Sequence, residues 1–252
     1  MQSASVGFQC PSCVAEGAKS IREPRTSFGG RVSADTSRVS FALIAINVLV
    51  YLLGRSNPDL LNVNYGNLAR AIDPATGELV GVATGQYYRL LTAAFLHASL
   101  FHLLSNMFAL FQIGPVLERA LGRSRFIALY VLSALGGSTL SYLLSDQTQL
   151  GVGASGAIFG LFGAYYVVVR RLGGETGSIV VLLVINLAIT FAVPIIDWRA
   201  HLGGLAVGAL VAAAFAYAPR GPRQARLQVG AAAAVGLLLV MAVIARTAAL
   251  SA

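Results

Sequence analysis

The chain has 252 residues, of which 56% are hydrophobic and 11% are charged, and its mean hydropathy is +0.73. A soluble domain carries about a quarter charged residues, so this composition argues against a soluble enzyme, a nucleic-acid-binding module or a disordered protein. The net charge of +8 is typical of basic loops beside anionic lipid and needs no nucleic acid as a partner. We therefore expect an all-α, polytopic membrane helix bundle in a lipid bilayer.

Residues 1–37 form the first predicted segment. They contain no apolar stretch long enough to span a membrane and no apolar region of a signal peptide. The run from Cys10 to Cys13 resembles half of a zinc ribbon, but a tetrahedral zinc site needs four ligands and the sequence holds no second pair. We assign no metal and interpret the pair as a degenerate zinc-binding segment, with a redox or intermolecular site as the alternative. We expect the segment to be cytoplasmic and poorly ordered.

Seven apolar segments follow, most of them close to the roughly 20 residues that a spanning helix needs. They cover residues 40–53, 100–117, 126–145, 151–169, 178–196, 199–218 and 228–244. The fourth and sixth are rich in glycine, and small residues let neighbouring membrane helices pack closely. The connection 54–89 is unusually long, which is typical of functional or disordered loops. Its aromatic residues favour a position partly in the outer membrane interface.

The distribution of basic residues predicts the orientation. Thirteen of the 18 lysines and arginines fall in the amino-terminal segment and in alternate loops on the same side, and five fall on the other side. Cytoplasmic loops carry the excess of positive charge, so we expect a cytoplasmic amino terminus and, with seven spans, an external carboxyl terminus. Nearly all of the basic residues are arginine, which favours a bacterial source and hence a bacterial plasma membrane.

Polar side chains inside spans are costly and indicate function. His102, Asn106, Ser155 and His201 all lie within about the first two turns of spans that descend from the outer face. His102 and Asn106 are four residues apart and share one helix face. A serine with a histidine in reach is the minimum for nucleophilic catalysis. His102, Asn106 and the Ser155 backbone N–H are candidate donors to an oxyanion.

Glycine spacing predicts how the serine and histidine meet. Gly156 and Gly160 follow Ser155, and Gly204 and Gly208 follow His201, and each pair creates a flat face for close helix packing. Asp197 lies one turn before the histidine, where it either contacts the ring or marks the water boundary. We favour the second interpretation and expect a Ser-His dyad.

These motifs, in this order, resemble the rhomboid family of intramembrane serine proteases over about residues 38–218. Tyr88-Arg89 resembles the family's Trp-Arg pair, and Glu118 resembles its structural glutamate. The resemblance implies a six-helix protease core (38–218) that cleaves transmembrane helices of other proteins near the outer face, without a cofactor. It also implies an additional seventh helix within 219–252 and a mobile fifth span at the substrate entrance.

The resemblance assigns the site residue by residue. It implies that Ser155 is the nucleophile and His201 the base, and that His102 and Asn106 help to form the oxyanion hole. Gly153 would line the site. Phe159 matches the position whose aromatic ring packs on the catalytic histidine; a tyrosine there could also hydrogen-bond, whereas phenylalanine only packs.

Less specific interpretations remain open from the sequence. Ser155 can be a small residue in a packing seam, and His102 and Asn106 can hold helices together. We interpret His97, rotated off the face of His102, as structural or loop-anchoring. The alternative function is a catalytically inactive rhomboid-like factor that binds or traffics membrane proteins; a transporter is a weaker one. The sequence identifies neither the substrate nor the oligomeric state.

Overall fold

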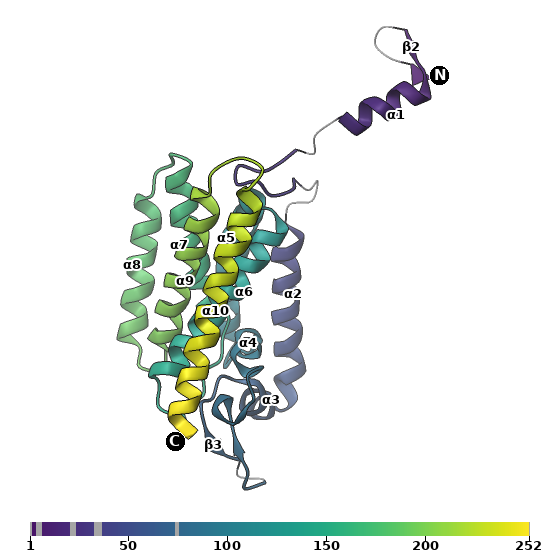
Figure 1. Cartoon of the computed structure of the whole chain (residues 1–252). Coiled ribbons are helices and arrows are strands. Elements are labelled where there is room, and N and C mark those ends of the chain that lie inside the picture. The colour runs from purple at the N-terminus through teal and green to yellow at the C-terminus, as the bar shows by residue number, and fades with distance from the viewer. Residues whose placement is uncertain (1, 4–6, 21–23, 33–36, 74–75, 252) are drawn as a thin grey trace.

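The computed structural model describes residues 2–3, 7–20, 24–32, 37–73 and 76–251 (Figure 1). Within these residues, seven helices of 16 residues or more stand side by side, which confirms the predicted all-α bundle. These helices are α2 (Arg38–Leu53), α5 (Leu100–Leu121), α6 (Arg123–Leu144), α7 (Ser155–Arg171), α8 (Gly177–Ala192), α9 (Trp198–Tyr217) and α10 (Gln224–Ser251). Consecutive helices run in opposite directions, so α5, α7 and α9 begin at the same end, here called the site end.

The shorter elements lie before α2 and between α2 and α5. They are β1 (Gln2–Ser3), β2 (Phe8–Gln9), α1 (Pro11–Ser20), η1 (Gly54–Ser56), α3 (Pro58–Tyr65), β3 (Ala71–Ile72), β4 (Leu79–Val80), η2 (Val82–Thr84), α4 (Arg89–Thr92) and η3 (Ala93–Phe95). Both strand pairs are antiparallel two-stranded ribbons.

Five helices in the described residues are long and apolar enough to cross a membrane: α2 with η1, α5, α6, α9 and α10. The chain is therefore an integral membrane protein. The apolar helix α8 is shorter than predicted. It ends at Ala192, because Pro194 disfavours helical geometry at the residue before it. Helix α7 begins at Ser155, because Gly153 has a φ of +133° that no helix accommodates.

Glycines bring the backbones of α7 and α9 into direct contact. A Cβ atom at Gly204 would collide with the carbonyl group of Gly156, and one at Gly208 would collide with the backbone of Gly160. Helix α6 joins this contact through Gly137, whose added Cβ would lie 2.6 Å from the Ala200 carbonyl oxygen. The glycine spacing therefore predicted the central packing of the bundle correctly.

The long connection between α2 and α5 is folded around one buried arginine. The Arg89 side chain is 1% exposed. Its guanidinium group donates to the carbonyl oxygens of Val63 (2.6 Å) and Gly66 (3.2 Å) and to Gln86 Oε1 (2.7 Å). Three acceptors from separate turns are thus tied to one rigid donor group, so this connection is an ordered part of the site end.

At the opposite end, Glu118 joins α5 to α2. Its carboxylate accepts hydrogen bonds from the backbone N–H groups of Val39 and Ser40 and from the Ser40 hydroxyl group. These N–H groups lie in the first turn of α2, where no intrahelical acceptor exists. The glutamate therefore caps α2, in agreement with the structural role that the resemblance implied.

We expect Gly208→Ala to lower the melting temperature in detergent by about 5 to 10 °C, because the added methyl group overpacks the α7–α9 contact by about 2 to 3 kcal/mol. Gly230→Ala is the matched control, since a Cβ there meets nothing within 4 Å and alanine favours the helix. Equal melting temperatures for both variants would contradict this account of the packing.

Candidate active site

The site end gathers the polar residues that the sequence singled out. His102 lies in the first turn of α5, Ser155 is the first residue of α7, and His201 lies in the first turn of α9. Helices α7 and α9 run in parallel with Gly156 against Gly204. The Ala200 carbonyl oxygen also lies against Gly156, so this register sets His201 close to the level of Ser155.

The His201 ring is held on both sides. Its side chain is 7% exposed, and the ring stacks on Phe159 with centroids 4.0 Å apart and planes 16° from parallel. Phe159 lies one turn after Ser155 on the same face of α7. The stacking partner expected for this position is therefore present, and it turns the imidazole toward the face that carries the serine.

Thr190 of α8 contacts the same ring. Its hydroxyl oxygen lies 2.7 Å from His201 Nδ1 and 2.7 Å from the Asn186 carbonyl oxygen. A carbonyl can only accept, so the single hydroxyl proton goes to Asn186 and the threonine oxygen accepts from Nδ1–H. The network therefore assigns the proton to Nδ1 and leaves Nε2 with a free lone pair.

Among the described residues, the hydrogen-bond partners of the Asp197 carboxylate do not include the imidazole ring. Its carboxylate accepts from the Ser141 hydroxyl group and from the backbone N–H of Arg199, which caps the start of α9. The ring partner is Thr190, which the sequence interpretation missed. Thr190 and Asn186 are four residues apart inside an apolar span, and that polar pair was the available signal.

Gly153 forms the floor between the serine and His102. A Cβ atom added to it would lie 2.6 Å from His102 Cε1 and 3.7 Å from Ser155 Oγ. Its backbone N–H donates to the Ala93 carbonyl oxygen (2.9 Å), which ties the start of α7 to the connection before α5. The imidazole of His102 and the hydroxyl of Ser155 thus border one open glycine face.

Asn106 is oriented by its own helix. One amide N–H of Asn106 donates to the His102 carbonyl oxygen at 2.8 Å, which leaves the second N–H of the amide for another acceptor. The side chain is buried. Asn106 therefore lies beside His102 as predicted, but part of its donor capacity is used in holding that turn.

Among the described residues, the Ser155 hydroxyl group makes no direct hydrogen bond to His201. Hydrogen bonds between catalytic groups are often long without substrate and shorten in the complex. Ser155 and His201 lie at one level, and stacking on Phe159 holds the imidazole on the face of α7 that carries the serine. The hydroxyl group and the imidazole are therefore near each other but not hydrogen-bonded.

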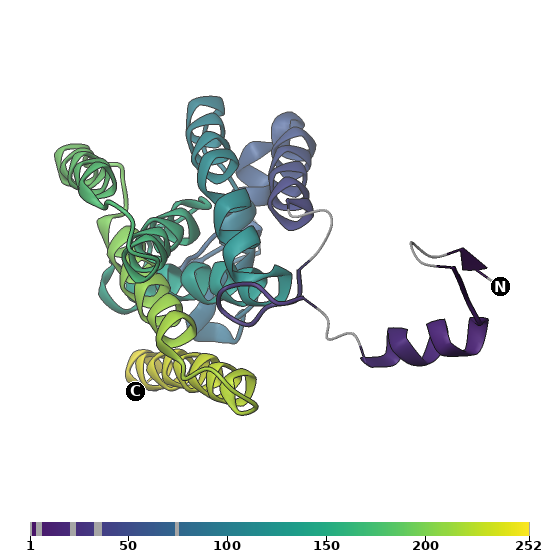
Figure 2. The same cartoon turned by 90° about the horizontal axis from the view of Figure 1, so that it is seen from above.

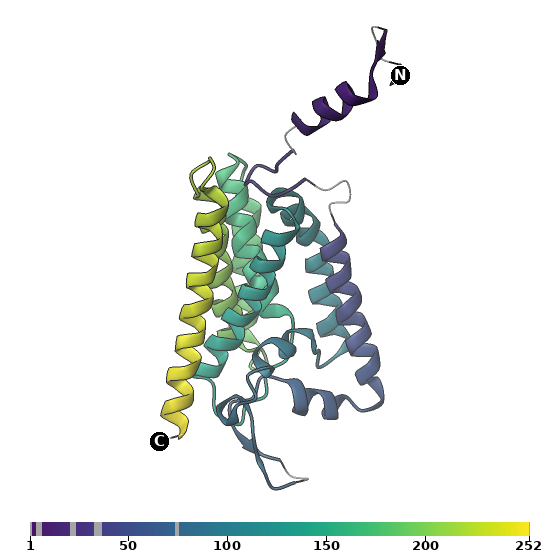
Figure 3. The same cartoon turned by 45° about the vertical axis from the view of Figure 1, so that its right-hand side comes forward.

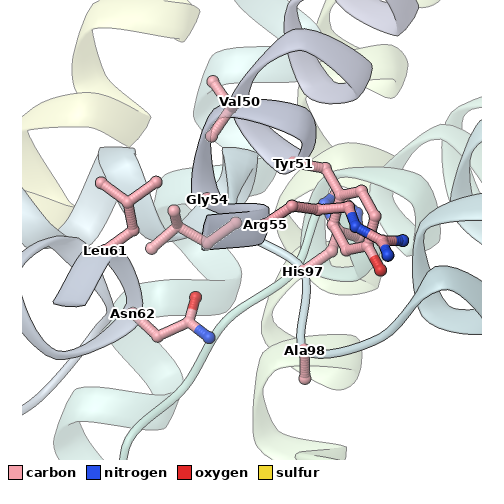
Figure 4. Close-up of a pocket in the computed structure, with 9 residues that line it drawn as sticks. Val50, Tyr51, Gly54, Arg55, Leu61, Asn62, His97 and Ala98 are labelled. Atoms are coloured by element: carbon pink, nitrogen blue, oxygen red, sulfur yellow. The ribbon is translucent and has the colours of Figure 1, made fainter. Parts of the chain in front are cut away.

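A cavity of about 310 Å³ at the site end adjoins His97 (Figure 4). It is lined by the end of α2, by η1, by the middle of α3 and by the stretch from Leu96 to Ala98. His97 borders this cavity and is 5% exposed, and neither of its ring nitrogens has a hydrogen-bond partner among the described residues. Its ring meets the His102 ring edge to face at 5.1 Å, which is compatible with the structural role predicted for it.

The cysteine pair lies away from these groups. Cys10 and Cys13 are exposed in α1, with their Sγ atoms 2.8 Å apart. Within the part of the chain that the structure describes, no three side chains of histidine, cysteine, aspartate or glutamate are grouped as metal ligands would be.

Comparison with known proteins places these features in a family. A family model described as a rhomboid domain matches residues 84–218. The rhomboid-family protein YdcA of Bacillus subtilis is 41% identical over 144 residues, which cover 55% of this chain and 72% of YdcA. Rhomboid protease GluP of the same organism is 36% identical over 182 residues, 69% of this chain and 34% of GluP. RHOMBOID-like protein 5 of Arabidopsis thaliana is 36% identical over 179 residues, 68% of this chain and 53% of that protein.

His97 predicts a pH dependence of stability. Burial, and then the nearby His102, lower the pKa of His97 to about 3, against about 6.5 in an unfolded chain. As the pH falls from 6.5 toward 3, the unfolded state binds a proton that the folded state rejects, so His97 stabilises the fold above pH 6.5 and this contribution is lost below it.

Between pH 7 and pH 5, the free energy of unfolding should fall by about 2 kcal/mol less in the His97→Gln variant than in the wild-type protein. The measurement is unfolding in detergent at both pH values. If the variant and the wild-type protein lose stability equally over this interval, His97 is not the group that titrates.

Proposed function

The chain belongs to the rhomboid family, and we propose that it is an intramembrane serine endopeptidase that hydrolyses peptide bonds in or near transmembrane helices of other membrane proteins. The protease name of GluP supports this class of activity. The observation that carries the proposal is the fixed imidazole of His201, stacked on Phe159 and bonded to Thr190 at the level of Ser155.

In the proposed reaction, Nε2 of His201 takes the proton of the Ser155 hydroxyl group as its oxygen attacks the substrate carbonyl carbon. The carbon–nitrogen bond then breaks, and the imidazolium gives its proton to the leaving amine. Nε2 then takes a proton from a water molecule whose oxygen attacks the ester carbon, the carbon–oxygen bond to Ser155 breaks, and the imidazolium returns the proton to the serine oxygen. Each proton abstraction uses a neutral imidazole with its proton on Nδ1, which is the tautomer that the Thr190 contact favours.

The negative charge that develops on the substrate oxygen needs donors aimed at it. We propose the backbone N–H of Ser155, the imidazole of His102 and the second amide N–H of Asn106. The first turn of α7 leaves its N–H groups without intrahelical acceptors, and Gly153 has no side chain to cover them. The position of Gly153 between the His102 ring and the Ser155 hydroxyl group supports its role in lining the site.

We propose the substrate class from the chemistry of a spanning helix. Its carbonyl groups are hydrogen-bonded within the helix, so cleavage requires local unwinding, and glycine, proline or small residues near the membrane boundary favour it. We retain a core of residues 38–218, with α10 as an added helix. We also retain an orientation with the site end at the external face and a cytoplasmic amino terminus in a bacterial plasma membrane.

A catalytically inactive factor that binds or traffics membrane proteins is the second candidate, because the missing bond between Ser155 and His201 favours it. A fluorophosphonate probe separates the two functions, since it labels a serine hydroxyl only where a base activates it.

We expect Ser155→Ala to abolish cleavage of a reconstituted transmembrane substrate while the melting temperature stays within about 2 °C of the wild-type value. Ser138→Ala, on α6, is a matched control and should cleave normally. Undiminished turnover by the Ser155→Ala protein, or cleavage that persists with no fluorophosphonate labelling, would falsify the assignment.

Thr190 gives a second test, because we propose that it positions His201 for the reaction. Thr190→Val keeps the shape of the side chain but removes the acceptor of Nδ1–H, so kcat should fall about tenfold or more with KM unchanged. Thr190→Ser keeps the hydroxyl group and should restore most of the rate. A loss of rate in both variants, or a fall in melting temperature that accounts for it, would show a packing role alone.

A further inference from the structure

Four arginines surround a second cavity, at the end of the bundle opposite Ser155. This cavity of about 870 Å³, here called the arginine groove, lies between the segment 24–32, the start of α6 and the start of α10. Arg25, Arg31, Arg123 and Arg125 line it, and Nε of Arg123 forms an ion pair with the Glu118 carboxylate at 3.9 Å. Figure 2 shows the amino-terminal segment passing beside the ends of these helices.

One buried glutamine fixes the geometry of the groove. Gln228 is 1% exposed, and its amide nitrogen donates to the carbonyl oxygens of Phe28 and Phe215. Its amide oxygen accepts from Nε and an Nη of Arg125 at 2.8 and 2.6 Å. Because an amide is neutral, this contact orients the Arg125 charge without neutralising it, and the charge of Arg25 is close enough to repel it.

The groove changes character along α10. Val229, Ala232 and Ala233 of α10 and Ala128 of α6 line it beyond the arginines. The α10 residues recur at spacings of three and four, so they form one stripe of the helix. This stripe lies near the start of α10, and Figure 3 shows that helix continuing along the bundle. The cavity is thus cationic at the membrane boundary and apolar deeper in.

We propose that the arginine groove binds an anionic phospholipid, with the phosphate among the arginines and one acyl chain along the stripe of α10. Guanidinium groups bind phosphate oxygens through paired donors. The cationic end of the groove suits a lipid phosphate, and its apolar end suits an acyl chain. A free phosphate ion would use the arginines but not the stripe. The site lies about 30 Å of helix from Ser155, so the proposal does not depend on catalysis.

Native mass spectrometry of the full-length protein in detergent tests this binding. We expect dioleoyl phosphatidylglycerol to be retained more than tenfold over dioleoyl phosphatidylcholine. Arg25→Gln should weaken retention about fivefold, and Arg25→Gln with Arg125→Gln about 25-fold, as the loss of one favourable charge contact per arginine implies. Arg226→Gln is the matched control, because Arg226 lies at the same end of α10 outside the groove.

A second pair of variants tests the acyl chain. Ala233→Phe fills the stripe and should reduce retention at least tenfold, whereas Ala234→Phe, outside the stripe, should not change it. Equal retention of the two lipids, or an equal loss with Arg226→Gln, would overturn the proposal in favour of diffuse attraction. Displacement of the lipid by millimolar inorganic phosphate, with no effect of Ala233→Phe, would overturn it in favour of a free-anion site. Ser155→Ala should bind the lipid like the wild-type protein, so a failed protease assignment leaves this test intact.

Discussion

The structure depends on the backbone contact between α7 and α9. Lipid gives helices no hydrophobic reason to associate, so close packing and weak polar contacts must hold them. Gly156, Gly160, Gly204 and Gly208 supply that packing, because a Cβ at Gly204 or Gly208 would collide with the backbone of Gly156 or Gly160, which cannot move aside. The same contact fixes the heights of Ser155 and His201. Stability of the bundle and alignment of the candidate site thus come from one set of missing side chains.

The surroundings of His201 suit a base that works inside a membrane. An aspartate beside the ring would bring a charge into a region where ionised groups are costly. The neutral hydroxyl group of Thr190 instead accepts a hydrogen bond from Nδ1–H, and Phe159 restrains the ring by stacking. Asp197 remains at the helix start, where it caps α9. The orientation and the tautomer of the His201 ring are therefore controlled by two neutral side chains, without a carboxylate.

The sequence predicted the fold and much of the candidate site because hydropathy marks spans and the glycine motifs mark the central contact. Other features depend on tertiary partners that have no sequence signature. Arg89 binds carbonyl oxygens, which every residue carries, so its role in ordering the long connection was hidden. The ring contact of Thr190 depends on how α8 meets α9, and spacing along one helix does not determine that. The start of α7 moved to Ser155 because a glycine with positive φ interrupts a stretch that hydropathy alone describes as continuous.

Helix α8 has only two buried residues among its 16, Ile179 and Thr190. Among the described side chains of α8, only Thr190 forms a hydrogen bond to another helix, and its hydroxyl oxygen accepts that bond from the imidazole of His201. Any outward tilt of α8 that widens the path to the site must therefore uncouple this hydroxyl from the ring. Under the proposed function, an open α8 and a correctly oriented base are then mutually exclusive, and an entering peptide would meet the oriented imidazole only after α8 has closed again.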